Sequence, residues 1–350
     1  SMAGRTNERL RVVVCGTGTV GAHAARAVLG RDDLELVGAK VYSDAKRGKD
    51  IGELLAGART GIAAVRSIEE VVAAKPDCVI YAPSAPQHEE IFQLLAAGVN
   101  VVTTAGGYLF YPFADAQLTA ALEQACQQGR SSFCGAGVNP GFVSARLPLV
   151  LSSWCRRIDR VFASECAVMV HYPSAALLFD LMHFGQPLDP KNCEKGQIGQ
   201  RIRVSFEAMV REIADGLGAK LETIVQSYKE AAAPVDLHVA AGVVPAGTVA
   251  AQQWRWTGMV EGKPLIELET NWLLTQELEG WPTKFGWTFA IDGDPGLDVT
   301  LYTRDGESPD DECCIATAMQ AVNVLPLISA AAPGVRTFLD LPPIYGRYQP

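Results

Sequence analysis

The first part of the chain alternates short apolar runs with longer amphipathic segments. The apolar runs are rich in Val and Ile and bounded by Gly, Pro or Asp, which is typical of buried parallel strands. We expect these strands at residues 10–15, 34–41, 78–82, 100–104 and 132–134. Helices are expected between them, ending near residue 29 and spanning 68–74, 91–97 and 114–128. Strands that alternate with helices predict βαβ units and a doubly wound parallel sheet.

The pattern changes after about Gly141. The elements expected there are helices at 147–153, 206–216 and 315–331, a strand at 160–170, and two hairpins, 248–260 with 264–273 and 287–291 with 297–302. Strand pairs that flank short Gly-containing turns are antiparallel. The predicted fold is α/β: a Rossmann-type doubly wound parallel sheet (1–145), then an α+β substrate and dimerisation domain with a mostly antiparallel sheet (146–311). Residues 312–350 form a last helix and tail.

The composition of the chain argues against several classes of function. The chain has 350 residues and a net charge of −9, with no basic block, so nucleic acid is not expected as a main partner. No apolar run approaches the ~18 residues of a membrane helix. The N-terminus lacks a signal-peptide core, and Ser1 before Met2 resembles an expression scar. Nine cysteines without C-x-x-C spacing indicate reduced thiols in a cytoplasmic protein. Five scattered histidines argue against a metal centre.

A glycine-rich motif follows the first expected strand and opens the first helix. Gly16-x-Gly18-x-x-Gly21 has the spacing of a dinucleotide-binding turn, and its position inside a βαβ unit makes the motif specific. The first glycine makes the turn, the second lets the backbone approach a pyrophosphate, and the third allows close packing. The N–H groups at the helix start then bind phosphate. The expected cofactor contacts are Gly16, Thr17, Gly18, Thr19, Val20 and Gly21.

The second expected strand ends without a carboxylate. An NAD site usually has Asp or Glu ~20 residues after the motif, on the ribose 2′-hydroxyl. Here the strand runs into Tyr42 and Ser43, and Lys46 and Arg47 follow. A hydroxyl followed by cationic donors suits a 2′-phosphate. We therefore expect all four residues to contact the cofactor and favour NADP(H) over NAD(H); a solvated charged loop is the alternative.

Ligands of an open parallel sheet lie beyond the carboxyl ends of its strands. The segments that follow two of the expected strands should therefore line the nicotinamide. They contribute Ala82, Pro83, Ser84, Thr104, Ala105 and Gly106. Residues 135–141 combine three glycines with Pro140, so they form either a backbone clamp, with Asn139 bonded to cofactor or substrate, or a hinge. His88 is interpreted as a capping or surface residue.

The order of several short segments resembles a known family. They are 41–43, 48–54, 100–104, 135–142, 246–252 and 339–343, which read VYS, GKDIGEL, NVVTT, GAGVNPGF, AGTVAAQ and LDLPP. The opening unit resembles dihydrodipicolinate reductase, and nearly the whole chain is similar to the 2,4-diaminopentanoate dehydrogenase and native amine dehydrogenase group. The resemblance implies NAD(P)H-dependent hydride transfer to a C=N or C=O carbon. It also implies a cleft between the domains, a C-terminal helix and tail (312–350) that return to the nucleotide domain, and a homodimer built on the second-domain sheet.

The chain departs from this group at one position. Amine dehydrogenases of the group carry a catalytic Glu just after the strand that matches 100–104, whereas this chain reads Ala105-Gly106-Gly107-Tyr108. Reductive amination with free ammonia is therefore in doubt. The proton that accompanies hydride transfer must come from another group. The candidates are Tyr108 and Tyr111 in this loop, and His171 with Tyr172 after strand 160–170. The alternative for each of them is a purely structural role.

The expected pocket is apolar and aromatic. Its expected members are Phe110, Tyr111, Phe113, Phe142, Tyr172, Leu178, Phe179, Met182 and Phe184, with Arg146 the nearest cation. We therefore expect an NADPH-dependent oxidoreductase that acts on a small, mostly apolar ketone or imine, with no metal. A nucleotide-binding sensor or scaffold that has lost its chemistry is the alternative.

Overall fold

The computed structural model describes residues 9–172, 174–192, 196–283, 285–304 and 309–348. The chain forms two compact units. Unit 1 comprises Ser1–Val138 and Cys313–Pro350, and unit 2 comprises Asn139–Glu312. The sequence had placed the first boundary seven residues later, at 145, because the helical pattern only begins again at residue 147.

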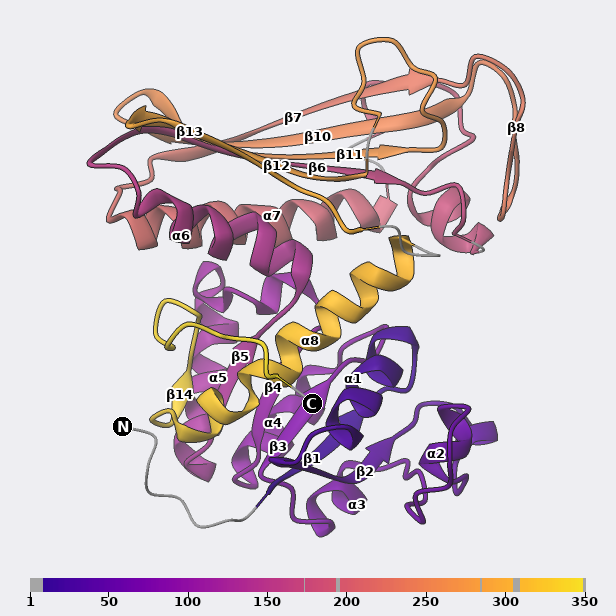
Figure 1. Ribbon diagram of the computed structural model, residues 1–350, viewed down its shortest axis with the longest axis vertical. Coiled ribbons are helices and arrows are strands. Elements are labelled where there is room, and N and C mark those ends of the chain that lie inside the picture. The colour runs from indigo at the N-terminus through magenta and orange to yellow at the C-terminus, as the bar shows by residue number, and fades with distance from the viewer. Residues whose placement is uncertain (1–8, 173, 193–195, 284, 305–308, 349–350) are drawn as a thin grey trace. The chain divides into compact units, whose positions relative to one another are not determined.

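Unit 1 contains a six-stranded sheet in which every neighbouring pair is parallel (Figure 1). The strand order is β14 (Gly334–Val335), β5 (Ser132–Gly135), β4 (Asn100–Thr103), β3 (Cys78–Tyr81), β1 (Leu10–Cys15) and β2 (Leu34–Lys40). The five expected strands are confirmed to within one residue. The short β14 was not foreseen, because two residues carry no readable pattern.

Helices cover both faces of this sheet. They are α1 (Thr19–Leu29), α2 (Ile51–Leu54), α3 (Ile68–Ala73), α4 (His88–Ala96), α5 (Ala116–Gly129) and α8 (Pro309–Ala330). The central strand β1 shows the two faces by alternation. Val12 and Val14 pack in a core with residues of α1 and α8, whereas Val13 and Cys15 pack with residues of α3, α4 and α5. The doubly wound prediction is confirmed.

Helix α8 corrects one expectation from composition. Glu312–Ala330 is long and apolar enough to cross a membrane by length and composition alone, contrary to the expectation that no run approaches that length. The helix instead contributes Ala321, Val322, Leu325 and Ile328 to the core beside α1, where all four are fully buried. This packing is that of a core helix in a globular unit.

Unit 2 contains a second six-stranded sheet, which is mostly antiparallel. Its strand order is β13 (Leu297–Leu301), β12 (Gly286–Asp294), β6 (Arg157–Val168), β11 (Lys263–Leu273), β10 (Val249–Val260) and β7 (Thr223–Ala232). Within this sheet, β6 and β11 are the only described neighbours that pair in parallel. A separate hairpin joins β8 (Leu237–Val239) to β9 (Gly242–Val244). The predicted hairpins are confirmed, but β7, β8 and β9 were not predicted.

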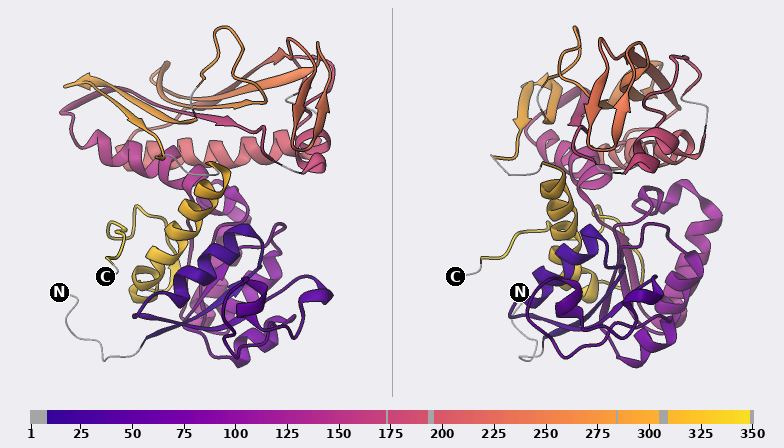
Figure 2. Two further views of the ribbon diagram at one scale, coloured as in Figure 1. Left: turned by 45° about the vertical axis from the view of Figure 1, so that its right-hand side comes forward. Right: turned by 90° about the vertical axis from the view of Figure 1, so that its right-hand side faces the viewer.

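Helices cover one face of the unit 2 sheet (Figure 2). They are α6 (Leu147–Ser152) and α7 (Gly196–Leu217), of which α7 extends well beyond the expected 206–216. Phe206 of α7 stacks on Trp256 of β10, with ring centroids 4.4 Å apart and planes 5° apart. Trp254 and Trp256 share a strand face and are both buried. These aromatic side chains therefore form the core between α7 and the sheet.

Candidate functional site

The turn between β1 and α1 needs glycine at two positions for space alone. Gly16 has φ +96°, and a Cβ there would lie 2.6 Å from the carbonyl oxygen of Ala82. A Cβ on Gly21 would lie 1.9 Å from the carbonyl oxygen of Gly16. A Cβ on Gly18, by contrast, would meet nothing within 4 Å. The second glycine is therefore not required by the protein's own packing, and open space lies above its backbone.

The N-terminus of α1 is suited to an anion. Gly18 is its N-cap residue and offers no side-chain oxygen to the first N–H groups of the helix. Thr19 and Val20 begin the helix, and Gly18 and Thr19 are exposed. Uncapped N–H groups and the helix dipole both favour a phosphate here. The open side of Gly18 and this uncapped helix fit the pyrophosphate of a dinucleotide, as the sequence predicts.

A buried ion pair lies at the carboxyl end of β2. The Lys40 ammonium is 2.7 Å from Glu90 of α4 and lies 3.6 Å from the centroid of the Tyr42 ring. Glu90 also accepts hydrogen bonds from the hydroxyls of Tyr42 at 2.6 Å and Tyr81 at 2.8 Å. Tyr42, an expected cofactor contact, therefore has its hydroxyl committed to the protein and offers only its ring to a ligand.

Burial and hydrogen bonding shift the pKa values of this cluster. Burial of Glu90 alone would raise its pKa, but the hydrogen bonds from Lys40, Tyr42 and Tyr81 outweigh it and hold the pKa below its usual value. Burial, followed by the hydrogen bond to Glu90, raises the pKa of Tyr42 far above its usual range. The cluster therefore holds a carboxylate and two neutral phenols.

The loop after β2 reaches back to the glycine turn. The Lys46 ammonium lies 3.2 Å from both the carbonyl oxygen and the hydroxyl oxygen of Thr17. Ser43 and Arg47 are exposed on the same loop. Asp44, the carboxylate in this loop, is paired with Arg66 at 3.2 Å. The structure thus places a lysine beside the phosphate-binding turn and directs the loop's carboxylate to an arginine.

The segments after β3 and β4 lie side by side, because these strands are neighbours. The N–H of Ala82 donates to Cys15, and that of Thr104 donates to Tyr81. Ala82, Pro83, Ser84, Thr104, Ala105 and Gly106 are therefore brought to one edge of the sheet, as expected. Gly106 has φ +66° and starts the 3₁₀ turn Gly107–Leu109, which carries Tyr108.

Tyr108 is hydrogen-bonded to a histidine that the sequence did not assign to the site. The Tyr108 hydroxyl lies 2.9 Å from Nε2 of His88, and the rings meet edge to face. His88 is the first residue of α4, after β3, and Tyr108 follows β4. Both are half-buried. His88 was expected to be a capping or surface residue; it is instead the partner of a candidate proton donor.

Of the other proton-donor candidates, Tyr111 is buried in unit 1, whereas His171 and Tyr172 belong to unit 2. His171 lies in a turn beyond the end of β6 and is exposed. Tyr172 packs on an apolar cluster that includes Leu178, Met182 and Phe184. These three were expected to line a substrate pocket, but they are buried in the unit's core. The packing of this core therefore explains why these three positions are apolar.

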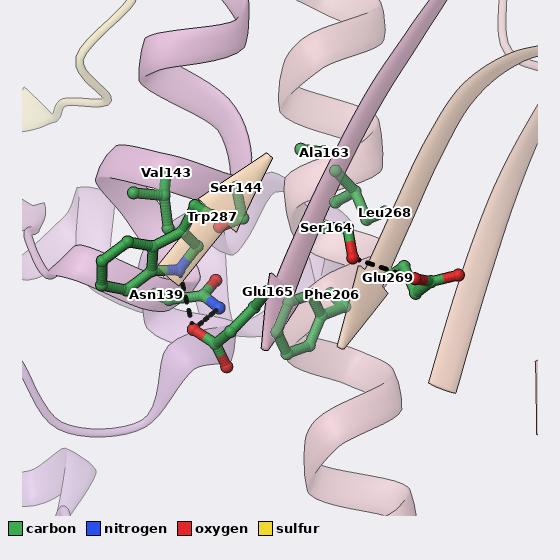
Figure 3. Close-up of a pocket in the computed structure, with 10 residues that line it drawn as sticks. All are labelled: Asn139, Val143, Ser144, Ala163, Ser164, Glu165, Phe206, Leu268, Glu269 and Trp287. Atoms are coloured by element: carbon green, nitrogen blue, oxygen red, sulfur yellow. Dashed lines mark hydrogen bonds between the residues drawn. The ribbon is translucent and has the colours of Figure 1, made fainter. Parts of the chain in front are cut away.

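A small polar pocket lies in unit 2 (Figure 3). Its lining is Asn139, Val143, Ser144, Ala163, Ser164, Glu165, Phe206, Leu268, Glu269 and Trp287, and its volume is about 10 Å³. The Glu165 carboxylate accepts hydrogen bonds from Asn139 at 2.6 Å and from the indole of Trp287 at 2.9 Å, both on Oε2. Trp272 donates to Oε1 at 3.2 Å. Asn139, expected to contact the cofactor, therefore binds Glu165.

Two family models together cover most of the chain. Residues 10–135 match the N-terminus of dihydrodipicolinate reductase. Residues 142–346, more than half of the chain, match the 2,4-diaminopentanoate dehydrogenase C-terminal domain. The chain belongs to the 2,4-diaminopentanoate dehydrogenase family. The resemblance inferred from short segments is confirmed, and membership makes the chain an NAD(P)-dependent oxidoreductase.

Relatives of this 2,4-diaminopentanoate dehydrogenase family member match along nearly their whole length. An amine dehydrogenase of Streptomyces virginiae is 29% identical over 360 residues, covering 97% of this chain and 98% of the relative. The 2,4-diaminopentanoate dehydrogenase of Acetoanaerobium sticklandii is 25% identical, with 96% and 94% covered. A solved amine dehydrogenase of Mycobacterium smegmatis shares the fold, with a TM-score of 0.76, 22% identity and 97% of each chain covered.

The sequence pattern assigned two residues of this family member, His88 and Glu165, to no site. His88 begins a helix 20 residues before Tyr108, and nothing local pairs the two. Glu165 could have been found from parity, because alternate residues of β6 face the same side and its neighbour Ala163 is buried. In the part of the chain that the structure describes, no group of three His, Cys, Asp or Glu side chains is arranged for a metal ion.

Proposed function

We propose that the chain is an NADPH-preferring oxidoreductase that transfers a hydride between the nicotinamide and a C=O or C=N carbon of a small, mostly apolar substrate. The observation that carries the proposal is the hydrogen bond between Tyr108 and His88 at the carboxyl ends of β3 and β4. Ligands of open α/β sheets bind at this edge. The glycine turn supplies the dinucleotide site at the same edge, within unit 1.

In this proposal Tyr108 supplies the proton. The nicotinamide supplies the hydride, and the carbon's oxygen or nitrogen then needs a proton. The Tyr108 hydroxyl holds this proton. When Nε2 of His88 carries a hydrogen, it donates to the Tyr108 oxygen, which leaves the Tyr108 O–H group to point at the substrate. When the proton leaves, a protonated His88 can donate to the phenolate oxygen. His88 is therefore a positioning residue, and Tyr108 is the group that faces the substrate.

The preference for NADPH rests on the loop after β2. Lys46 is held beside Thr17 of the glycine turn, and Ser43 and Arg47 are exposed nearby in sequence. Glu90 is occupied by Lys40 and two tyrosines and is not left to bind a ribose 2′-hydroxyl, and the exposed Asp44 is paired with Arg66. A 2′-phosphate would find cationic and hydroxyl donors there.

Two further aspects come from the family resemblance. The relatives are named amine dehydrogenase and 2,4-diaminopentanoate dehydrogenase, so we propose a ketone, aldehyde or cyclic imine as the substrate class. Reduction without ammonia is favoured, because Ala105, Gly106 and Gly107 offer no carboxylate after β4. We also propose a cytoplasmic homodimer that is built on the sheet of unit 2.

The test is NADPH consumption with a panel of aldehydes, ketones and cyclic imines, each with and without ammonium, and with NADH in parallel. We expect turnover with NADPH and a higher kcat/KM for NADPH than for NADH. Tyr108→Phe should lower kcat by about 100-fold or more, the range of a lost general acid, without weakening NADPH binding. His88→Asn should lower kcat less and alter its pH profile, whereas a merely structural role would leave that profile unchanged.

Tyr111→Phe serves as the matched control, since Tyr111 lies three residues beyond Tyr108 in the same loop. An equal loss of kcat in this variant would show that the loop's packing matters rather than the Tyr108 proton. Tight NADPH binding without any turnover would contradict the proposal and favour a nucleotide-binding sensor or scaffold.

A further inference from the structure

A carboxylate lies on the helix-covered face of the unit 2 sheet. Ala163 and Glu165 are two residues apart in β6, and both line the pocket together with Phe206 of α7 and Trp287 of β12 (Figure 3). Four of the side chains that line the pocket beside Glu165 are apolar or aromatic, namely Ala163, Phe206, Leu268 and Trp287. A carboxylate in such surroundings is retained only with compensating hydrogen bonds or a counter-ion.

Glu165 differs in its partners from Glu267 and Glu269, two carboxylates of the neighbouring strand β11. Glu267 is paired with Arg160, and Glu269 with Arg255. The partners of Glu165 are the side-chain N–H groups of Asn139, Trp272 and Trp287, all of them neutral. Among the residues that the structure describes, no Lys, Arg or His forms an ion pair with it. Its negative charge is thus hydrogen-bonded but not neutralised.

A second polar atom in the pocket has no hydrogen-bond partner. Asn139 donates its Nδ2 to Glu165, and its Oδ1 is buried and accepts no hydrogen bond from the described residues. The backbone fixes this arrangement: Gly141 has φ +131°, and its N–H donates to the hydroxyl of Ser144 at 2.8 Å. Buried acceptors are normally satisfied by protein, water or ligand. The pocket therefore presents a carboxylate oxygen and an amide oxygen, both able to accept.

We propose that Glu165 and Asn139 form a binding site for a small nitrogen cation, either ammonium or the protonated amino group of a primary amine. Such a group brings N–H donors to Oδ1 of Asn139 and to Oε1 of Glu165, and it neutralises the carboxylate. A cavity of about 10 Å³ is the size of one water molecule, which matches one ammonium group.

The inference goes beyond the proposed function, in which reduction without ammonia is favoured, because it gives unit 2 a binding site for ammonia or an amine in its protonated form. The segment after β4 offers no carboxylate to a nitrogen cation. Glu165 of unit 2 is a carboxylate that can still accept hydrogen bonds. The binding itself requires no nicotinamide and no turnover, so it can be tested separately from the reaction.

The experiment is a calorimetric titration of the full chain with ammonium chloride and methylammonium chloride at constant ionic strength. Potassium chloride and tetramethylammonium chloride serve as comparison cations. We expect ammonium and methylammonium to bind more tightly than potassium, and tetramethylammonium, which is bulky and lacks N–H donors, not to bind. Binding should also change the tryptophan fluorescence, because two indoles donate to Glu165.

Glu165→Gln should weaken binding by about tenfold or more, as loss of a charge-assisted hydrogen bond does, and Asn139→Leu should weaken it less. Glu279→Gln, an exposed carboxylate of the same unit, is the matched control and should bind as the unaltered chain does. Absence of ammonium binding, equal binding of potassium, or full binding by a folded Glu165→Gln variant would overturn the proposal. Cation binding without any oxidoreductase turnover would instead contradict only the proposed function.

Discussion

The cluster of Lys40, Glu90, Tyr42 and Tyr81 shows what single residues contribute beneath the dinucleotide site. The Lys40 side chain is 4% exposed and that of Glu90 13%, so neither charge is well hydrated. Removing one partner of such a pair leaves a buried charge, which is far more costly than removing both. Cys15 of β1 lies on the same side of the sheet as this cluster. Burial raises the pKa of its thiol to about 12. It is therefore no nucleophile at neutral pH.

We expect Glu90→Gln to lower the free energy of unfolding by about 3–5 kcal/mol, because it strands the Lys40 ammonium. The pKa of Glu90 is lowered by folding, so the ionised group stabilises the folded state above its unfolded value and loses that effect as pH falls through the folded value. The loss of unfolding free energy in Glu90→Gln should therefore be largest at neutral pH and become smaller as the pH falls. Urea unfolding at several pH values measures this.

Glu89→Gln is the matched control for this prediction, since Glu89 is the exposed neighbour on the same helix. Replacing both members of the pair, Lys40→Met with Glu90→Leu, should restore most of the lost stability. A Glu90→Gln variant no less stable than Glu89→Gln would contradict the prediction.

The sequence indicated Tyr42 as a site residue but gave no sign of its partner. Glu90 lies 48 residues later, on a helix whose start was expected at residue 91 rather than His88. The pairing depends on how α4 packs beside β2 and β3, and no local pattern encodes that. The same reason hid the bond between His88 and Tyr108. Contacts between distant segments thus account for most of what the sequence did not predict.

At the scale of elements, the β1–α1 turn was the most predictable part of the site. The sequence signals of this turn lie within residues 10–21, and the groups that require Gly16 and Gly21 are in the same turn or just after the neighbouring strand β3. Gly16 and Gly21 are required by packing, whereas Gly18 is open. Substitutions at different glycines of this turn can therefore test folding and cofactor binding separately.

We expect Gly18→Ala to change the free energy of unfolding by no more than about 1 kcal/mol, because its φ of −75° suits alanine and its Cβ meets nothing. The same methyl group would obstruct the pyrophosphate, so NADPH affinity should fall about tenfold or more. Gly21→Ala should destabilise by about 3 kcal/mol, since its Cβ would lie 1.9 Å from an oxygen. Thermal unfolding and NADPH fluorescence titration measure the two effects; unaltered NADPH affinity in Gly18→Ala would contradict the role of the turn.

At the scale of the whole molecule, the chain leaves unit 1 at residue 138 and returns to it at residue 313. The family resemblance implies that the last helix returns to the nucleotide domain, but its packing against α1 could not be read from the sequence, because a helix that is apolar on several sides has no marked stripe. Each unit has its own hydrophobic clusters. Unit 1 thus depends on a segment that follows the whole of unit 2 in the sequence.

Because unit 1 depends on α8, a substitution of a buried residue in α8 should destabilise unit 1 locally. Leu325 is fully buried in the core shared with α1, whereas Ile315, on the same helix, is 40% exposed. Leu325→Ala should destabilise unit 1 by about 2–5 kcal/mol, and Ile315→Ala by less than about 0.5 kcal/mol. Hydrogen exchange read by mass spectrometry should show faster exchange in β1 and α1 of the first variant only.

The tryptophans provide an internal reference for the same variant. All six, at positions 154, 254, 256, 272, 281 and 287, belong to unit 2. In urea, the Leu325→Ala variant should lose NADPH binding at a lower concentration than the unaltered chain, while its tryptophan transition shifts less. Equal shifts of both signals would contradict separate cores and show that the two units unfold as one cooperative body.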